Sequence, residues 1–332
     1  MKGKSVFSYV LVFIIFLLAY WGVTYTADGK GYEMFFQGKL ESRDKGFEFL
    51  ALLFDNLGYG YSYLYRFHIV CMALFYILFL KCVKSPPYIL IAFLIVNYVA
   101  LGNQIRFYVA LPLSYIALYE LGVKRKYISY LLLSGLSIMF HSTLIILHGC
   151  VLLYCFIINR RFSKRTVIMV LLSNMFIWLI LHKGLSVAEQ YGSYLSKDGA
   201  SSTGGGVYNL VPSLIAFLVI YALKRQLQSC SNYDATLRFI YVLSFSTSML
   251  LLISIHVQIF ANRFISSCFL VWLTYCISAK VYLPKSKKYL ANLATVSIVI
   301  VFFLWSYIMP YLMGLTPHSL IEAGLMLESY EF

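Results

Sequence analysis

The stretch that decides the fold class is 289–309, which reads YLANLATVSIVIVFFLWSYIM and has no charged residue over its 21 positions. A helix needs about 20 mostly apolar residues to cross the hydrocarbon core of a bilayer. The basic residues Lys285, Lys287 and Lys288 stand directly before it. Basic residues gather on the cytoplasmic side of membrane spans. The stretch therefore predicts a transmembrane helix whose first residue lies at the cytoplasmic face.

Outward from this stretch, the rest of the chain repeats the same pattern of long apolar runs. The sequence is 61% hydrophobic and only 12% charged, whereas soluble domains carry about 25% charged residues. We predict an all-α, polytopic membrane bundle of about eleven transmembrane helices that forms a single membrane domain over residues 1–332. The other expected spans are 6–25, 62–80, 87–102, 105–122, 127–140, 142–158, 166–182, 207–223, 237–256 and 259–279.

Two boundaries in this series need a decision. The first run follows Lys2 and Lys4, as a signal peptide would, but it has near-spanning length and no small-residue cleavage site follows it. We expect it to be retained as the first helix. The fifth and sixth runs are separated only by Phe140-His141-Ser142. Because together they exceed thirty residues, we expect two helices joined by a tight turn rather than one kinked helix.

The distribution of basic residues predicts the orientation of the bundle. With the N-terminus in the cytoplasm, 18 of the 27 Lys and Arg residues fall on the cytoplasmic side, as the positive-inside rule requires. The large loops, about 27–60 and 183–206, then face the periplasm, together with the C-terminal tail. The positive-inside rule thereby explains the net charge of +14. No nucleic-acid partner is expected. The cytoplasmic residues are Lys2, Lys4, Lys81, Lys84, Lys124, Arg125, Lys126, Arg160, Arg161, Lys164, Arg165, Lys224, Arg225, Arg238, Lys280, Lys285, Lys287 and Lys288.

Several common catalytic and cofactor motifs are missing from the sequence. There is no phosphate-binding P-loop, no dinucleotide-binding glycine motif, no HExxH and no GxSxG. There is no DxD pair to hold a metal with a nucleotide sugar, and the seven cysteines form no CxxC pair. We therefore expect neither a metal nor a cofactor.

Three arginines lie at the outer ends of predicted spans, where a charge is costly and suggests function. They are Arg66, Arg106 and Arg263 at the starts of the second, fourth and tenth spans. Guanidinium groups match phosphate oxygens in geometry, and helix N-termini favour anions. The outward-facing phosphate ligand of a membrane is a lipid pyrophosphate, so we predict that these arginines bind one. For Arg66, a side chain that merely reaches the headgroups is an equally good interpretation.

Three further residues are candidates for acid–base chemistry. His141 stands at the break between the fifth and sixth spans, and Asp44 and Glu48 lie in the first outer loop. A carboxylate or an imidazole within reach of a hydroxyl can take its proton during group transfer. His141 is alternatively a structural histidine hydrogen-bonded within the bundle. Asp44 and Glu48 are alternatively solvated loop charges, or form an ion pair with Arg43 or Lys45.

Four stretches resemble the EpsG-like branch of the Wzy polysaccharide polymerases. They are Lys45-Gly46-Phe47-Glu48-Phe49-Leu50, Gln104-Ile105-Arg106 with Ala110, Phe140-His141-Ser142-Thr143-Leu144-Ile145, and Asn262-Arg263-Phe264. Their order and spacing are similar to that family's over roughly residues 28–280. Phe107 stands where the family usually has Gln, and Phe47 where it usually has Tyr. Neither departure removes a charged group, but both leave room for a different acceptor.

The resemblance implies a GT-C-like helical fold and a glycosyltransferase of the bacterial inner membrane that needs neither metal nor nucleotide. Such enzymes transfer a growing glycan from one undecaprenyl pyrophosphate to the sugar of another carrier-linked repeat unit. It also implies a chain-length regulator as a partner. On this interpretation Arg106, Arg263 and Arg66 bind pyrophosphate, and Glu48 or His141 is the base with Asp44 nearby. The alternatives are a ligase that moves a finished glycan once, a flippase for lipid-linked sugars and a membrane acyltransferase.

Overall fold

The computed structural model describes residues 2–23, 29–40, 44–158, 203–227, 234–250 and 258–308, and four single helical positions at 168, 172, 175 and 179. Every regular element in these ranges is a helix, as predicted. The contacts divide the chain into two units, Met1–Ile145 with Phe303–Phe332, and Ile146–Phe302. Nearly all of the predicted span 166–182 and the outer-loop residues 183–202 lie outside the described residues.

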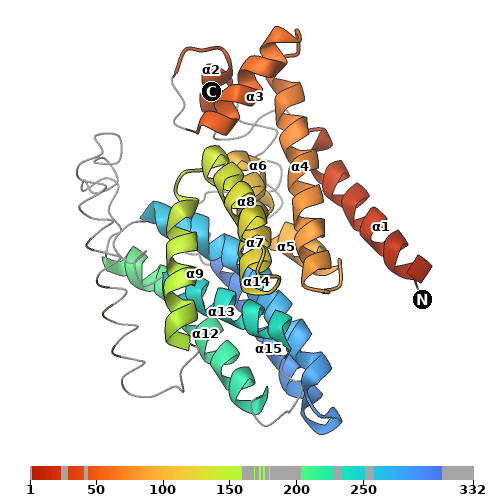
Figure 1. Ribbon diagram of the computed structural model, residues 1–332, viewed down its shortest axis with the longest axis vertical. Helices are drawn as coiled ribbons and strands as arrows, with labels where there is room; N and C mark the ends of the chain where they lie inside the picture. The colour runs from red at the N-terminus through yellow and green to blue at the C-terminus, as the bar shows by residue number, and fades with distance from the viewer. Residues whose placement is uncertain are drawn as a thin grey trace. The chain divides into compact units, whose positions relative to one another are not determined.

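The first unit is organised around one buried helix, α7 (Ile105–Gly122). It packs against α4 (Tyr61–Cys82) and α8 (Tyr127–Phe140), and α1 (Lys2–Trp21) packs on α4 (Figure 1). The Ser137 hydroxyl of α8 donates to the backbone carbonyl of Ala110 in α7 and also bonds the Ser114 hydroxyl. Small hydroxylated residues between membrane helices allow such close, hydrogen-bonded packing. Helix α7 therefore holds its N-terminal residues, Arg106 among them, in a fixed place.

The predicted span 87–102 is wrong as a single helix, because the structure breaks it at Asn97. Two short helices result, α5 (Ile89–Val96) and α6 (Tyr98–Asn103). Such a break frees backbone carbonyls that cannot remain unbonded in an apolar environment. Side chains bond carbonyls on both sides of the break: the Asn97 side-chain amide donates to the Phe93 carbonyl, which also accepts the Asn97 backbone N–H, and hydroxyls from three separate elements bond other carbonyls of α5 and α6. These hydroxyls are Tyr20 to Tyr98, Tyr65 to Gly102 and Tyr307 to Ile95.

The first predicted outer loop contains two helices, α2 (Gly29–Phe36) and α3 (Lys45–Asn56). Helix α3 packs against α2, α4 and the C-terminal end of α8. Gly46 makes the contact with α8 possible, because a Cβ added there would lie 3.2 Å from the Met139 backbone carbonyl carbon and oxygen. The loop is thus a packed part of the first unit.

The predicted turn between the fifth and sixth runs is confirmed. Helix α8 ends at Phe140, and α9 (Leu144–Ile158) begins after His141, Ser142 and Thr143. The His141 N–H still donates to the Ser137 carbonyl, and Leu144 N–H donates to the His141 carbonyl. The turn therefore places His141 and Ser142 where one helix ends and the next begins.

In the second unit, α12 (Thr203–Leu227), α13 (Ala235–Leu250) and α14 (Gln258–Tyr282) pack on one another. A 3-10 turn (Lys285–Lys287) leads to α15 (Lys288–Phe303), whose Phe302 ring packs on Trp272 of α14. A π-helical segment (Leu304–Ile308), which belongs to the first unit, follows. Since α12 begins at Thr203, the glycine-rich end of the second predicted outer loop is helical, which satisfies backbone groups that a loop would leave open.

Three helical stretches in the described part of the chain are long and apolar enough to cross a membrane: Tyr61–Cys82, Leu210–Leu227 and Lys285–Ile308. The chain is therefore a helical membrane protein. The number of eleven spans, the single membrane domain, the GT-C-like arrangement and the cytoplasmic N-terminus stay predictions.

Candidate functional site

An ion pair between Asp44 and Arg106 forms the centre of the candidate site. Arg106 Nη1 lies 2.9 Å from Asp44 Oδ2, and the two side chains are only 18% and 9% exposed. Arg106 stands in the first turn of α7, and Asp44 directly precedes α3. Water screens such a sheltered pair less than a surface pair, so the pair strongly orients both side chains.

Three aromatic rings surround the Arg106 guanidinium. Its central carbon lies 4.7 Å from the ring centre of Tyr32, 5.3 Å from that of Phe35 and 5.2 Å from that of Phe47. The faces of aromatic rings attract cations. The guanidinium is therefore held as a cation in a largely apolar enclosure built by α2 and α3.

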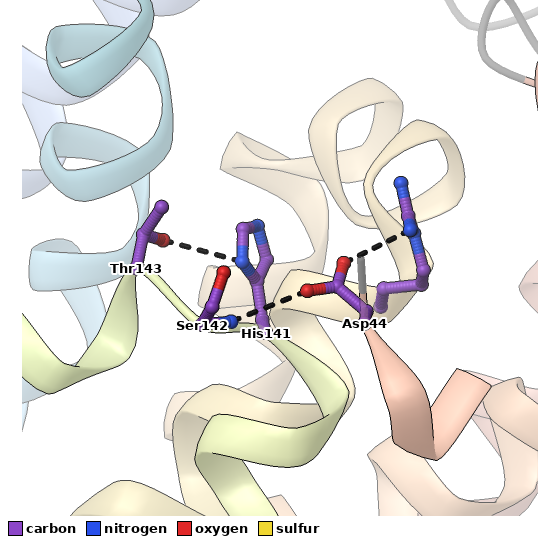
Figure 2. A network of polar contacts seen from close by, with 5 residues as sticks. Asp44, His141, Ser142 and Thr143 are labelled. Carbon is purple, nitrogen blue, oxygen red and sulfur yellow. Dashed lines mark hydrogen bonds and ion pairs between the residues drawn. The ribbon is translucent and has the colours of Figure 1, made fainter. Parts of the chain in front are cut away.

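The Asp44 carboxylate also reaches the turn between α8 and α9. Its Oδ1 accepts the backbone N–H of Ser142 at 3.3 Å, as the dashed line in Figure 2 shows. The starts of α3, α7 and α9 thereby meet at one carboxylate, because Asp44, Arg106 and Ser142 each stand within two residues of a helix start. Helix N-termini carry partial positive charge, so this junction favours an anion.

His141 lies beside this junction and is buried, with 8% exposure. Its Nδ1 lies 3.2 Å from the Thr143 hydroxyl (Figure 2). Its ring meets the Phe107 ring edge-on at 5.2 Å. The structure therefore brings His141 to the same junction as Asp44 and Arg106, with Phe107 as its aromatic neighbour.

Two of the other predicted residues make their described contacts elsewhere. Glu48 Oε2 lies 2.7 Å from Lys45 Nζ, and its side chain is 41% exposed. The Arg66 guanidinium lies 5.4 Å from the Trp21 ring and 6.0 Å from the Tyr63 ring. The Glu48–Lys45 contact is the ion pair named above as an alternative, whereas the Arg66 guanidinium lies over two aromatic rings.

Arg263 belongs to the second unit. Its backbone is helical within α14, but its side chain lies outside what the structure describes. The prediction that Arg263 converges with Arg106 on one ligand therefore stays a prediction.

One residue beside the site was not singled out from the sequence. His68 of α4 is 1% exposed, and its ring packs on Phe47 at 5.5 Å and on Phe140 at 6.2 Å. Its Nδ1 lies 2.8 Å from the Leu64 carbonyl, so Nδ1–H is the donor. Only its position in an apolar span could have drawn attention to it. Its role here is to support the aromatic wall of the site.

The described residues contain no group of three or more His, Cys, Asp or Glu side chains that could hold a metal ion. The polar groups that meet at the junction are instead a guanidinium, a carboxylate, an imidazole and a backbone amide. This set can hold an anion and can accept a proton.

Comparisons with known proteins give one positive result. Neither the curated proteins nor the solved structures contain a match to this chain. The model of the EpsG family, in contrast, matches residues 7–320. This match covers both units and all four stretches on which the resemblance rests, and the chain belongs to the EpsG family.

Proposed function

We propose that this protein is a polysaccharide polymerase that joins undecaprenyl-pyrophosphate-linked oligosaccharide repeat units at the outer face of the bacterial inner membrane. Membership of the EpsG family supports a membrane enzyme of the glycosyltransferase type in polysaccharide biosynthesis. The observation that carries the proposal is the sheltered Arg106 guanidinium, 2.9 Å from Asp44, at a junction of helix N-termini. Such a place suits the diphosphate of a lipid carrier.

The proposed reaction is a glycosyl transfer between two carrier-linked glycans. The acceptor hydroxyl oxygen forms a bond to the anomeric carbon of the donor while the bond from that carbon to the pyrophosphate oxygen breaks. The electron pair leaves with the pyrophosphate, and Arg106 stabilises the negative charge that grows there. The hydroxyl proton passes to a nearby base.

Asp44 and His141 are the better candidates for this base, and Glu48 the weaker one. Asp44 and His141 are both buried. Asp44 lies beside Arg106, and His141 precedes Ser142, whose N–H donates to Asp44. Glu48 is more exposed and paired with Lys45. A base must come within hydrogen-bond reach of the hydroxyl it deprotonates. The preference is supported by the contacts of Asp44, which pairs with Arg106 and accepts the N–H of the residue after His141.

We assign Arg263 and Arg66 to the same diphosphate as further ligands. The assignment of Arg263 rests on its place at the predicted outer start of a span beside Asn262. Substrates of this kind serve O-antigen, capsule or exopolysaccharide synthesis, and a chain-length regulator is the expected partner.

The test uses the purified full chain with a synthetic carrier-linked repeat unit and no other component. We expect a ladder of products from the wild type, and a rate at least about a hundredfold lower from Arg106→Ala, because one electrostatic contact to a leaving group contributes about that factor. Lys39→Ala, which removes an exposed cation from the same outer loop, is the matched control and should keep the full ladder. Arg263→Ala tests the second arginine in the same way.

Two results would contradict the proposal. A single transfer product without a ladder would indicate a ligase. A complete ladder from both Arg106→Ala and Arg263→Ala would contradict the assignment of these arginines to a diphosphate site.

A further inference from the structure

We propose that the Asp44 carboxylate is an internal substitute for the substrate diphosphate: it occupies the position on Arg106 that a phosphate oxygen takes, and the substrate must displace it. This inference rests on the proposed function. It adds that the site without substrate is closed by its own carboxylate, and that loading of the donor releases Asp44.

The first argument is the set of donors around Asp44. One carboxylate oxygen lies 2.9 Å from the Arg106 guanidinium, and the other accepts the Ser142 amide. Proteins also bind phosphate oxygens with guanidinium groups and backbone N–H donors, and the Ser142 N–H stands in the turn just before α9. The carboxylate thus makes the contacts that a diphosphate would seek.

The second argument is electrostatic. The Arg106 guanidinium has aromatic rings of Tyr32, Phe35 and Phe47 about it, and the ion pair is mostly sheltered from water. Two neighbouring anions repel strongly in such a place, because the effective dielectric constant is low. A diphosphate carries more negative charge than a carboxylate, so Arg106 exchanges one anion for the other.

The third argument is that the released carboxylate has another position nearby. Asp44 is the N-cap residue of α3, yet its side chain makes no cap hydrogen bond to that helix. An aspartate at an N-cap ordinarily accepts an N–H of the first helical turn. A rotation about the Asp44 side-chain bonds would carry the carboxylate from Arg106 to the first turn of α3, where it stays an anion and can take the acceptor proton.

A binding measurement separates this inference from a simple orienting role of Asp44. We expect inorganic pyrophosphate to bind the purified full-length Asp44→Asn variant at least about tenfold more tightly than the wild type, because the competing charge is gone. Asp55→Asn neutralises an exposed carboxylate on the same helix and should leave the affinity unchanged. Arg106→Ala should abolish binding. Titration calorimetry in detergent reads the affinities, and melting curves confirm that each variant is folded.

Unchanged or weaker binding by Asp44→Asn overturns the inference, because an orienting carboxylate would lower the affinity when removed. Asp44→Ser, which keeps a cap-forming hydroxyl without the charge, must give the same increase and replaces Asp44→Asn if that variant does not fold. Pyrophosphate binding that is absent from all variants, with a normal product ladder from the wild type, overturns the inference alone. Loss of the ladder in the wild type overturns the proposed function.

Discussion

At the residue scale, Asp44 and Glu48 differ in environment although only four positions separate them. Asp44 precedes α3 and turns toward α7 and α9, where it is 9% exposed. Glu48 lies one turn into the same helix and pairs with Lys45 at the surface. The position relative to the start of α3 therefore decides which carboxylate meets Arg106.

Gly46 gives a prediction at this scale. Gly46→Ala places a methyl group 3.2 Å from the Met139 backbone, and backbone in a helix cannot move aside as a flexible side chain does. We expect α3 to shift away from α8, which weakens the contact of Asp44 with Ser142. The free energy of unfolding should fall by about 1–3 kcal/mol. The melting temperature and the polymerisation rate should fall with it. Thermal unfolding and the product ladder measure these effects.

Gly31→Ala is the matched control for Gly46→Ala. Gly31 lies in α2, and a Cβ there meets no atom within 4 Å. Alanine favours a helix over glycine, so this variant should be as stable as the wild type or slightly more stable. Equal behaviour of the two variants would show that the contact between α3 and α8 does not control the site.

At the scale of elements, the break between α5 and α6 depends on helices distant in sequence. Tyr20→Phe removes the hydroxyl that donates to the Tyr98 carbonyl at 2.7 Å. Hydrogen bonds of this kind between membrane helices contribute about 0.6 kcal/mol on average and up to about 1.7, and we expect a loss of stability within that range. Tyr88→Phe, at a residue that is 57% exposed, should cost less. Equal melting temperatures for both variants would contradict the assigned role of Tyr20.

A second prediction for an element concerns the start of α13. Asp234 accepts the Thr236 N–H, as an N-cap does, and the Tyr282 hydroxyl of α14 at 2.7 Å. Asp234→Ala removes both bonds and should lower the free energy of unfolding by about 1 kcal/mol or more. Chemical or thermal unfolding in detergent measures it, with the exposed Asp55→Ala as the control. A loss of similar size in the control would refute the capping role.

At the scale of the whole molecule, the positive-inside pattern predicts which ends face the periplasm. In a variant without its native cysteines, Lys39→Cys in the first outer loop should react with a membrane-impermeant maleimide in intact spheroplasts. Lys285→Cys, between α14 and α15, should react only after permeabilisation. Both positions are exposed, so accessibility reports the side of the membrane. The reverse pattern would invert the topology and place the Asp44–Arg106 pair on the wrong side for a carrier-linked substrate.

The sequence by itself determined where several of the long helices lie. A run of apolar residues forms a helix in lipid because every backbone group must be satisfied within the segment, which is a local property. The helices near 62–80, 105–122 and 289–309, and the turn at Phe140-His141-Ser142, therefore follow from composition alone. Membership of the EpsG family likewise follows from the sequence.

Only the tertiary structure decided which residues meet. Asp44 and Ser142 are 98 positions apart, and no local pattern distinguishes Asp44 from Glu48 as the partner of Arg106. The break at Asn97 is equally non-local, because the hydroxyls of Tyr20, Tyr65 and Tyr307, all distant in sequence, bond carbonyls of the two short helices. Helix formation depends on the transfer of each segment into lipid, which the residues of that segment decide. The site depends on packing and hydrogen bonds between segments. The order of residues along one segment does not predict those contacts.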